Sequence, residues 1–160
     1  MRSHYPSIRS RRIQDALRAR RGVVVVTGQI EHGPDECLVA LGNELARRGK
    51  RVLGLFHGEP RRTEFEFVGG SDAGWSLDFK AAAARLRARS AKPQALVVEQ
   101  IRDLTSARAV FALAERALVL TMLWSAGEAD AAARLAELLG PARARRMARL
   151  RLVIAPRARA

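Results

Sequence analysis

The residues with the clearest chemical pattern form a glycine turn after the β-branched run 23–27, which is typical of a buried strand. The turn consists of Gly28, Gln29, Ile30, Glu31, His32, Gly33, Pro34, Asp35 and Glu36. Its two glycines have the spacing of the phosphate-binding motif G-x-x-x-x-G-K-[ST], in which backbone N–H groups surround phosphate, a lysine binds the terminal phosphates and a hydroxyl holds magnesium. Pro34 stands at the lysine position and Asp35 at the hydroxyl position. The turn therefore has the outline of a nucleotide site without its phosphate-binding side chains.

The substituted residues favour a helix and disfavour a phosphate. Pro34 supplies neither a cation nor a backbone donor, but its fixed φ suits the first turn of a helix. Asp35 and Glu36 place carboxylates at the helix N-terminus, where the macrodipole favours negative charge and where a phosphate would lie. Two like charges about 4 Å apart repel by about 4 kcal/mol at an effective dielectric near 20. We interpret the turn as a well-capped helix start, with a modified but working phosphate site as the alternative.

The composition limits the class of protein. The chain has 160 residues, of which 48% are apolar, so it fits one domain with its own core. The single cysteine, Cys37, excludes a disulfide framework and a cysteine-rich metal site, and its place on the apolar side of a helix favours a buried hydrophobe over a nucleophile. No segment has the length of a membrane span or the form of a secretory signal. We expect a cytoplasmic protein without a bound metal, with attachment to a membrane surface as an alternative.

The net charge of +13 comes mainly from arginine, and the arginines gather near the two ends of the chain, in segments 9–21 and 143–159. This charge is typical of partners such as nucleic acid, anionic lipid or an acidic protein. Tyr5 is the only aromatic residue beside either cluster, so the stacking surfaces of a single-strand binder are missing. A solvated basic surface is the simpler interpretation.

Apolar runs and amphipathic segments alternate along the chain, which predicts a parallel sheet with helices on both faces, an α/β fold. Strands are expected at 23–27, 51–56, 65–67 (as a short edge strand), 95–98, 117–123 and 150–154. Helices are expected at 8–20, 34–48, 78–89, 103–115 and 127–139, with a further basic helix after residue 141. The predicted organisation is a basic N-terminal helix or arm, residues 1–21, followed by one domain, residues 22–160.

From about residue 22 to residue 157, the order of segments resembles the C-terminal RecA-like domain of the type II/IV secretion and pilus-retraction ATPases, the PilT/GspE-type family. Residues 21–28 are similar to that family's entry into its Walker A loop, and residues 93–104, PQALVVEQIRDL, resemble its Walker B strand and the turn that follows. Residues 118–125 are similar to the strand that leads into its histidine box. The resemblance implies a RecA-like P-loop NTPase core with a mostly parallel sheet and helices on both faces.

The positions that the resemblance marks as catalytic carry other residues. Glu99 takes the place of a glycine and Gln100 the place of the catalytic glutamate, and a carboxamide cannot accept a proton from water. Glu99 is not expected to substitute, because adjacent strand residues face opposite sides. Trp124 stands at the histidine-box position, and Glu59-Pro60 is a displaced remnant of the acidic box. Asp103 is expected to cap the helix that follows it.

Because these positions depart together, we predict a catalytically inactive pseudo-ATPase with no cofactor, which acts as an interaction or regulatory module of a type IV pilus or secretion machine. Its partner would be the pilus or secretion ATPase, or another component of that machine. One alternative is a weak nucleotide-binding ATPase that uses ATP and Mg²⁺ and is completed by a partner. A lesser alternative is a basic module that binds nucleic acid. We also expect no separate N-terminal domain like that of the family, which puts an ordinary hexamer in doubt and leaves homo-oligomer formation open.

Overall fold

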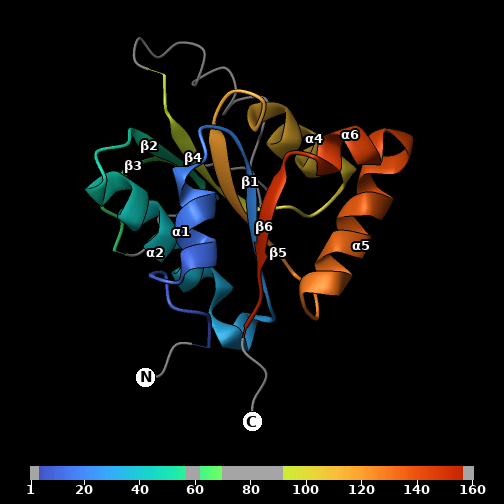
Figure 1. The fold of residues 1–160 in the computed structure, drawn as a ribbon, viewed down its shortest axis with the longest axis horizontal. Coiled ribbons are helices and arrows are strands. Elements are labelled where there is room, and N and C mark those ends of the chain that lie inside the picture. Colours follow the sequence, from blue (N-terminus) through green and yellow to red (C-terminus); the bar gives the residue numbers. More distant parts are fainter. Residues whose placement is uncertain (1–3, 57–61, 70–91, 157–160) are drawn as a thin grey trace.

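The computed structural model describes residues 4–56, 62–69 and 92–156, and it contains a six-stranded sheet in the order β3-β2-β4-β5-β1-β6 (Figure 1). All neighbouring strands are parallel. The strands are β1 (Gly22–Thr27), β2 (Val52–Phe56), β3 (Glu66–Gly69), β4 (Ala95–Gln100), β5 (Leu118–Leu123) and β6 (Leu150–Ile154). The predicted helix at 78–89 and the pair Glu59-Pro60 lie outside the described residues.

The strands form where the sequence carries apolar, β-branched runs. Every residue of β1, β2 and β5 is buried, as expected for strands covered on both faces. The predicted short edge strand is confirmed as β3, which lies at the margin of the sheet. Strand β4 is two residues longer than predicted, because hydrogen bonding to β5 continues to Gln100.

Helices cover both faces of the sheet, which confirms the α/β prediction. On one face, α1 (Arg11–Arg18) and α2 (Pro34–Arg47) pack against the side chains of Val24 and Val26. On the other face, α4 (Leu104–Leu113) and α5 (Glu128–Leu139) pack against Val23 and Val25. The short α6 (Arg143–Met147) is the predicted basic helix after residue 141.

The N-terminal segment packs closely on the sheet. Helix α1 is shorter than the predicted 8–20, and Ile13, Ala16 and Leu17 are buried in the same core as α2. Tyr5, before the helix, is buried as well. The predicted boundary at residue 22 stays a prediction. Within the described residues, no helix combines the length and the apolar character needed to cross a membrane.

Candidate functional site

The glycine turn folds into a short 3-10 helix, η1 (Ile30–His32), that connects β1 to α2. The N–H of His32 donates to the carbonyl of Gln29 at 3.0 Å, and the N–H of Gly33 donates to the carbonyl of Ile30 at 3.0 Å. Gly33 adopts the left-handed conformation, with φ of 67°, and turns the chain into α2. Two N–H groups in the middle of the turn are therefore used by the turn's own carbonyls.

The start of α2 carries the substitutions that the sequence singled out. Pro34 is buried at the first helical position and has no N–H to offer. Asp35 and Glu36 lie in the first turn of the helix with exposed side chains. Cys37 is half-buried against the core beneath α2, and desolvation raises the pKa of its thiol to about 12, which disfavours a nucleophile.

Tyr5 covers the beginning of the turn, a role that the sequence did not reveal. Its side chain is 4% exposed, and its hydroxyl donates to the carbonyl of Thr27 at 3.1 Å. A Cβ atom on Gly28 would lie 2.4 Å from the Tyr5 hydroxyl and 3.5 Å from the Pro156 ring. Burial raises the pKa of Tyr5 above its ordinary value, and nearby Cys37 and Asp35 add to the rise. The tyrosine therefore closes the space beside the first glycine of the motif.

Further contacts tie the turn to its surroundings. The ring of His32 meets the ring of His4 edge-on, with centroids 5.4 Å apart. The hydroxyl of Thr27, at the end of β1, forms a hydrogen bond with the hydroxyl of Ser125, which follows β5. These contacts hold the turn against both the N-terminal segment and the neighbouring strand.

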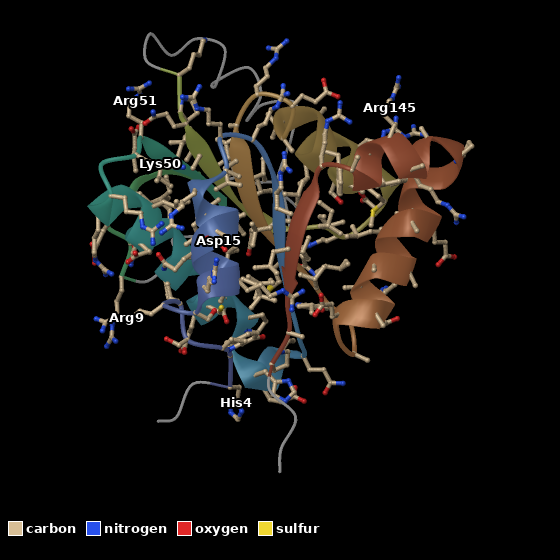
Figure 2. The ribbon with its side chains drawn as sticks, in the orientation of Figure 1. His4, Arg9, Asp15, Lys50, Arg51 and Arg145 are labelled. Carbon is tan, nitrogen blue, oxygen red and sulfur yellow. The ribbon has the colours of Figure 1, made fainter. Side chains whose placement is uncertain are left out.

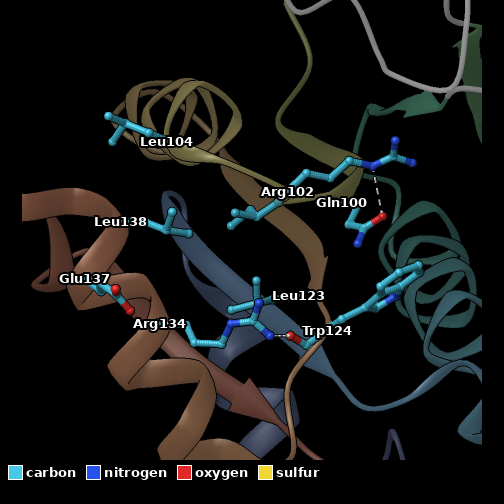
Figure 3. A pocket seen from close by; sticks show the side chains of 9 residues that line it. Gln100, Arg102, Leu104, Leu123, Trp124, Arg134, Glu137 and Leu138 are labelled. Atoms are coloured by element: carbon cyan, nitrogen blue, oxygen red, sulfur yellow. Dashed lines mark hydrogen bonds between the residues drawn. The ribbon is translucent and has the colours of Figure 1, made fainter.

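Glu99 and Gln100 lie at the end of β4, where the register with β5 shifts between Val98 and Gln100. The strict alternation that we used to place the two side chains on opposite sides does not hold through such an irregularity. The Gln100 side-chain oxygen accepts a hydrogen bond from Nε of Arg102 at 3.1 Å (Figure 3). The Gln100 carboxamide, at the position where the resembling family has its catalytic glutamate, is therefore hydrogen-bonded to a neighbouring arginine.

A cleft of about 780 Å³ opens beside these residues, between α4, α5 and the ends of β4 and β5 (Figure 3). Its lining includes Gln100, Leu104, Trp124, Arg134 and Leu138. The carbonyl of Trp124 accepts a hydrogen bond from Arg134, and the indole ring points away from that arginine. The structure therefore brings Gln100 and Trp124 together at one cleft, whereas the glycine turn does not contribute to its lining.

Asp103 caps α4, as predicted. Its carboxylate accepts a hydrogen bond from the N–H of Ser106 at 2.7 Å, and the Ser106 hydroxyl accepts one from the N–H of Asp103 at 2.9 Å, which completes a capping box. The N–H and the hydroxyl of Ser106 both donate to the Asp103 carboxylate, and these two hydrogen bonds hold the pKa of Asp103 below its ordinary value. Asp103 is accordingly bound within the scaffold.

Among residues 4–56, 62–69 and 92–156, no three His, Cys, Asp or Glu side chains lie close enough to hold a metal ion. The polar side chains at the turn include the exposed carboxylates of Glu31, Asp35 and Glu36 and the His4–His32 pair.

A parallel sheet with helices on both faces and a glycine turn between its first strand and the next helix is a doubly wound α/β arrangement. Scans against protein-family models and curated proteins found no match. Solved structures do match. The pilus retraction motor PilT with bound ADP gives a TM-score of 0.74 at 16% identity, over 92% of this chain and 46% of that one.

Two ATPases named DotB are also similar. DotB of Legionella pneumophila gives a TM-score of 0.69 at 22% identity, over 89% of this chain and 42% of that one. DotB of Yersinia pseudotuberculosis gives 0.63 at 15% identity, over 91% and 41%. The chain spans less than half the length of each of these proteins. Its fold is the ATPase-core fold of these proteins.

Proposed function

We propose that this chain is a RecA-like core without ATPase activity that acts as an interaction module of a pilus or secretion machine. The observation that carries the proposal is the glycine turn, in which His32 and Gly33 donate their N–H groups to the turn's own carbonyls. A phosphate-binding loop depends on such N–H groups pointing at the ligand. Phosphate binding here would first require those hydrogen bonds to break.

Electrostatics supports the same conclusion. The first turn of α2 has Pro34 where a phosphate-binding loop has its lysine and the carboxylate of Asp35 where that loop has its hydroxyl, and a second carboxylate, Glu36, follows directly. Tyr5 adds a buried side chain over Gly28, with its hydroxyl bonded to the protein. Bound nucleotide would therefore meet negative charge and a closed turn, with no lysine to compensate.

An interaction role needs an accessible surface, and the cleft beside β4 and β5 is suited to it. Leu104 and Trp124 line this cleft and are 38% and 45% exposed, which is high for large apolar side chains. Arg102 and Arg134 add positive charge around them. Aromatic and arginine side chains in such settings often dominate binding energy. We propose that a protein of the machine, such as its ATPase, docks here.

Titration calorimetry tests the loss of nucleotide binding. We expect no heat of binding when Mg-ATP or Mg-ADP is added to the purified chain at millimolar concentration, and no nucleotide-dependent shift in melting temperature. A pilus-retraction ATPase titrated in parallel serves as the positive control. A dissociation constant below about 0.1 mM, equivalent to about −5.5 kcal/mol, would contradict the proposal.

Docking is tested separately with Trp124→Ala and Leu104→Ala, because both side chains are partly exposed and should be dispensable for folding. We expect each variant to weaken binding to the ATPase of the same cell by tenfold or more in a pull-down or biolayer assay. Ile30→Ala is the matched control, because Ile30 is an exposed large apolar side chain that does not line the cleft. Unchanged binding of both cleft variants would remove the cleft from the proposal.

A second candidate function is an ATPase completed by a partner chain. It is favoured by Gly33, which keeps the left-handed conformation at the helix entrance, and by the fold shared with a motor that binds ADP. Under this candidate, ATP turnover appears only when the partner is present and disappears in Gly33→Ala. Absence of turnover in the reconstituted mixture would eliminate it.

A further inference from the structure

The amino ends of five strands are aligned at one edge of the sheet. Val52, Ala95, Leu118 and Gly22, the first residues of β2, β4, β5 and β1, are register partners across the sheet. The first residue of β6, Leu150, pairs with Val23, one position further along β1. Residues that precede these strands therefore lie side by side, whatever their separation in the sequence.

Basic residues lie within three positions of the first residue of each of these strands. We call them the basic edge, which consists of Arg21, Arg51, Lys92, Arg116, Arg149 and Arg151. All are exposed except Arg149, which is half-buried. In Figure 2, Lys50, Arg51 and Arg145 lie at the same end of the molecule, opposite His4. Arginines from both terminal segments, Arg21 from the first and Arg149 and Arg151 from the second, therefore lie on one edge of the sheet.

Few acids interrupt this surface. Among the described residues in the four positions before these five strands, Glu115 is the one carboxylate, and it pairs with Arg149 at 2.9 Å. The acidic side chains Glu64 and Glu66 stand at the start of the sixth strand, β3, and mark where the basic edge ends. The basic edge thus runs from β2 to β6.

Several of its side chains are held in place by backbone carbonyls. Nε of Arg51 donates to the carbonyl of Lys92 at 3.1 Å, and Nε of Arg151 donates to the carbonyl of Arg21 at 3.1 Å. Each of these bonds crosses from one strand start to the next. Guanidinium groups fixed in this way lose less entropy when they bind phosphate oxygens.

Acidic side chains are found at the opposite end of the sheet, where Arg12 pairs with Glu128. Glu31, Asp35 and Glu36 follow β1, and Asp103 follows β4. Glu128 and Asp130, in the first turn of α5, follow β5. A basic edge on a chain with a net charge of +13 attracts a polyanion.

Apolar side chains are concentrated away from the basic edge. The large apolar side chains that are exposed among the described residues, Ile30, Leu104 and Trp124, all follow the carboxyl ends of strands. The described part of the basic edge therefore offers no aromatic platform on which single-stranded bases stack and no apolar wedge for a bilayer. Its chemistry is suited to regularly spaced phosphates alone.

We propose that the basic edge binds the phosphate backbone of double-stranded nucleic acid without reading its sequence. Five adjacent strands with spacings near 4.8 Å give a row on the order of 19 Å long. A duplex carries one charge per about 1.7 Å of its axis, or one per about 3.4 Å on each strand, so this row faces about five phosphates of one strand. This activity is independent of the proposed function, because the glycine turn and the cleft lie beyond the other ends of the strands.

The salt dependence of binding gives the proposal a magnitude. About five phosphate contacts predict that log K falls with log salt at a slope near −4.5. Raising the salt from 50 to 200 mM should then weaken binding about 500-fold.

Fluorescence anisotropy with a labelled 20-base-pair duplex tests this slope. The test variant is Arg21→Ala/Arg116→Ala. Among the described residues, neither of these side chains forms a hydrogen bond or an ion pair, so their removal should leave the fold unchanged. The control is Arg9→Ala/Arg11→Ala, which removes the same charge at the other end of α1, toward His4 (Figure 2). We expect the slope to fall to about −2.7 in the test variant and to stay near −4.5 in the control.

The remaining outcomes decide against the proposal. It is overturned if the wild type does not bind the duplex at 50 mM salt, if the two double variants weaken binding equally, or if a single strand of equal length binds more tightly. Binding to phosphatidylserine vesicles without binding to the duplex would also overturn it. Two duplexes of unrelated sequence should bind within about twofold of each other, and strong preference for one would contradict readout of the backbone alone.

Discussion

The contact between Tyr5 and Gly28 makes a double-mutant cycle informative. In Gly28→Ala, the new Cβ would lie 2.4 Å from the Tyr5 hydroxyl, and the backbone would be held at φ of 152°, which side chains rarely allow. The backbone strain costs about 1–3 kcal/mol. The steric overlap adds about 1–3 kcal/mol. We therefore expect Gly28→Ala to lower the free energy of unfolding by about 2–6 kcal/mol.

The substitution Tyr5→Phe separates the cost of backbone strain from the cost of steric overlap. It removes the hydroxyl that donates to the Thr27 carbonyl, at a cost of about 1–3 kcal/mol for an unsatisfied buried acceptor. In this background, the added Cβ no longer meets the hydroxyl, so Gly28→Ala should cost only the strain term. The two substitutions together should be less destabilising than the sum of the single effects by about 1–3 kcal/mol.

Urea unfolding followed by circular dichroism measures the cycle. With an m-value near 2 kcal/mol/M, a coupling of 2 kcal/mol corresponds to about 1 M in the midpoint. Gly49→Ala is the matched control, because Gly49 has φ of 76° with no atom near the added Cβ, and its cost should not depend on Tyr5. Additivity of Gly28→Ala and Tyr5→Phe within about 0.5 kcal/mol would refute the view that Tyr5 closes the turn.

Three further predictions concern the turn and the cap of α4. Pro34→Lys combined with Asp35→Ser restores the side chains of the phosphate motif. Calorimetry should still detect no tight Mg-ATP binding, because the N–H groups of His32 and Gly33 remain hydrogen-bonded within the turn. A submillimolar dissociation constant for Mg-ATP would contradict this prediction. Cys37 should react slowly with a thiol reagent at pH 8, because desolvation raises its pKa to about 12, and it should react quickly once the chain is unfolded in urea. A fast reaction of the folded chain would contradict the raised pKa. Asp103→Ala should cost about 1 kcal/mol, or about 2–4 °C in melting temperature. Because Ser106 lowers the folded pKa of Asp103, that stabilisation is present above about pH 4 and is lost as the pH falls through the lower folded value; a difference from wild type that persists at pH 2 would argue against the cap.

Much of the fold was predictable because the local signals are strong. The run from Val23 to Thr27 is β-branched and apolar, and it forms a strand with every residue buried. Pro34 marks the first residue of α2, and Asp103 caps α4, since both act through their own backbone and nearest neighbours. The predicted ends of strands were less accurate where hydrogen bonds to a neighbouring strand decide them. Strand β4, for example, extends to Gln100 because its pairing with β5 continues to that residue.

The candidate site was predicted in parts. The sequence identified the turn, Gln100 and Trp124, and the structure places the last two at one cleft. It did not indicate that Tyr5 covers the turn, because a contact between residues 5 and 28 leaves no periodic pattern in the sequence. Nor did it indicate the shift in register beside Glu99, which depends on how β4 pairs with β5.

The sequence by itself determined the strands, the helices and the substitutions in the phosphate motif, because these follow from local residue types and spacing. Only the tertiary structure decided which distant residues meet. The parallel sheet aligns the starts of five strands, and so it gathers Arg21, Arg51, Arg116 and Arg149 at one edge although they lie far apart in the chain. Hydrogen bonding between strands sets this alignment, and the sequence pattern of any single strand does not contain it.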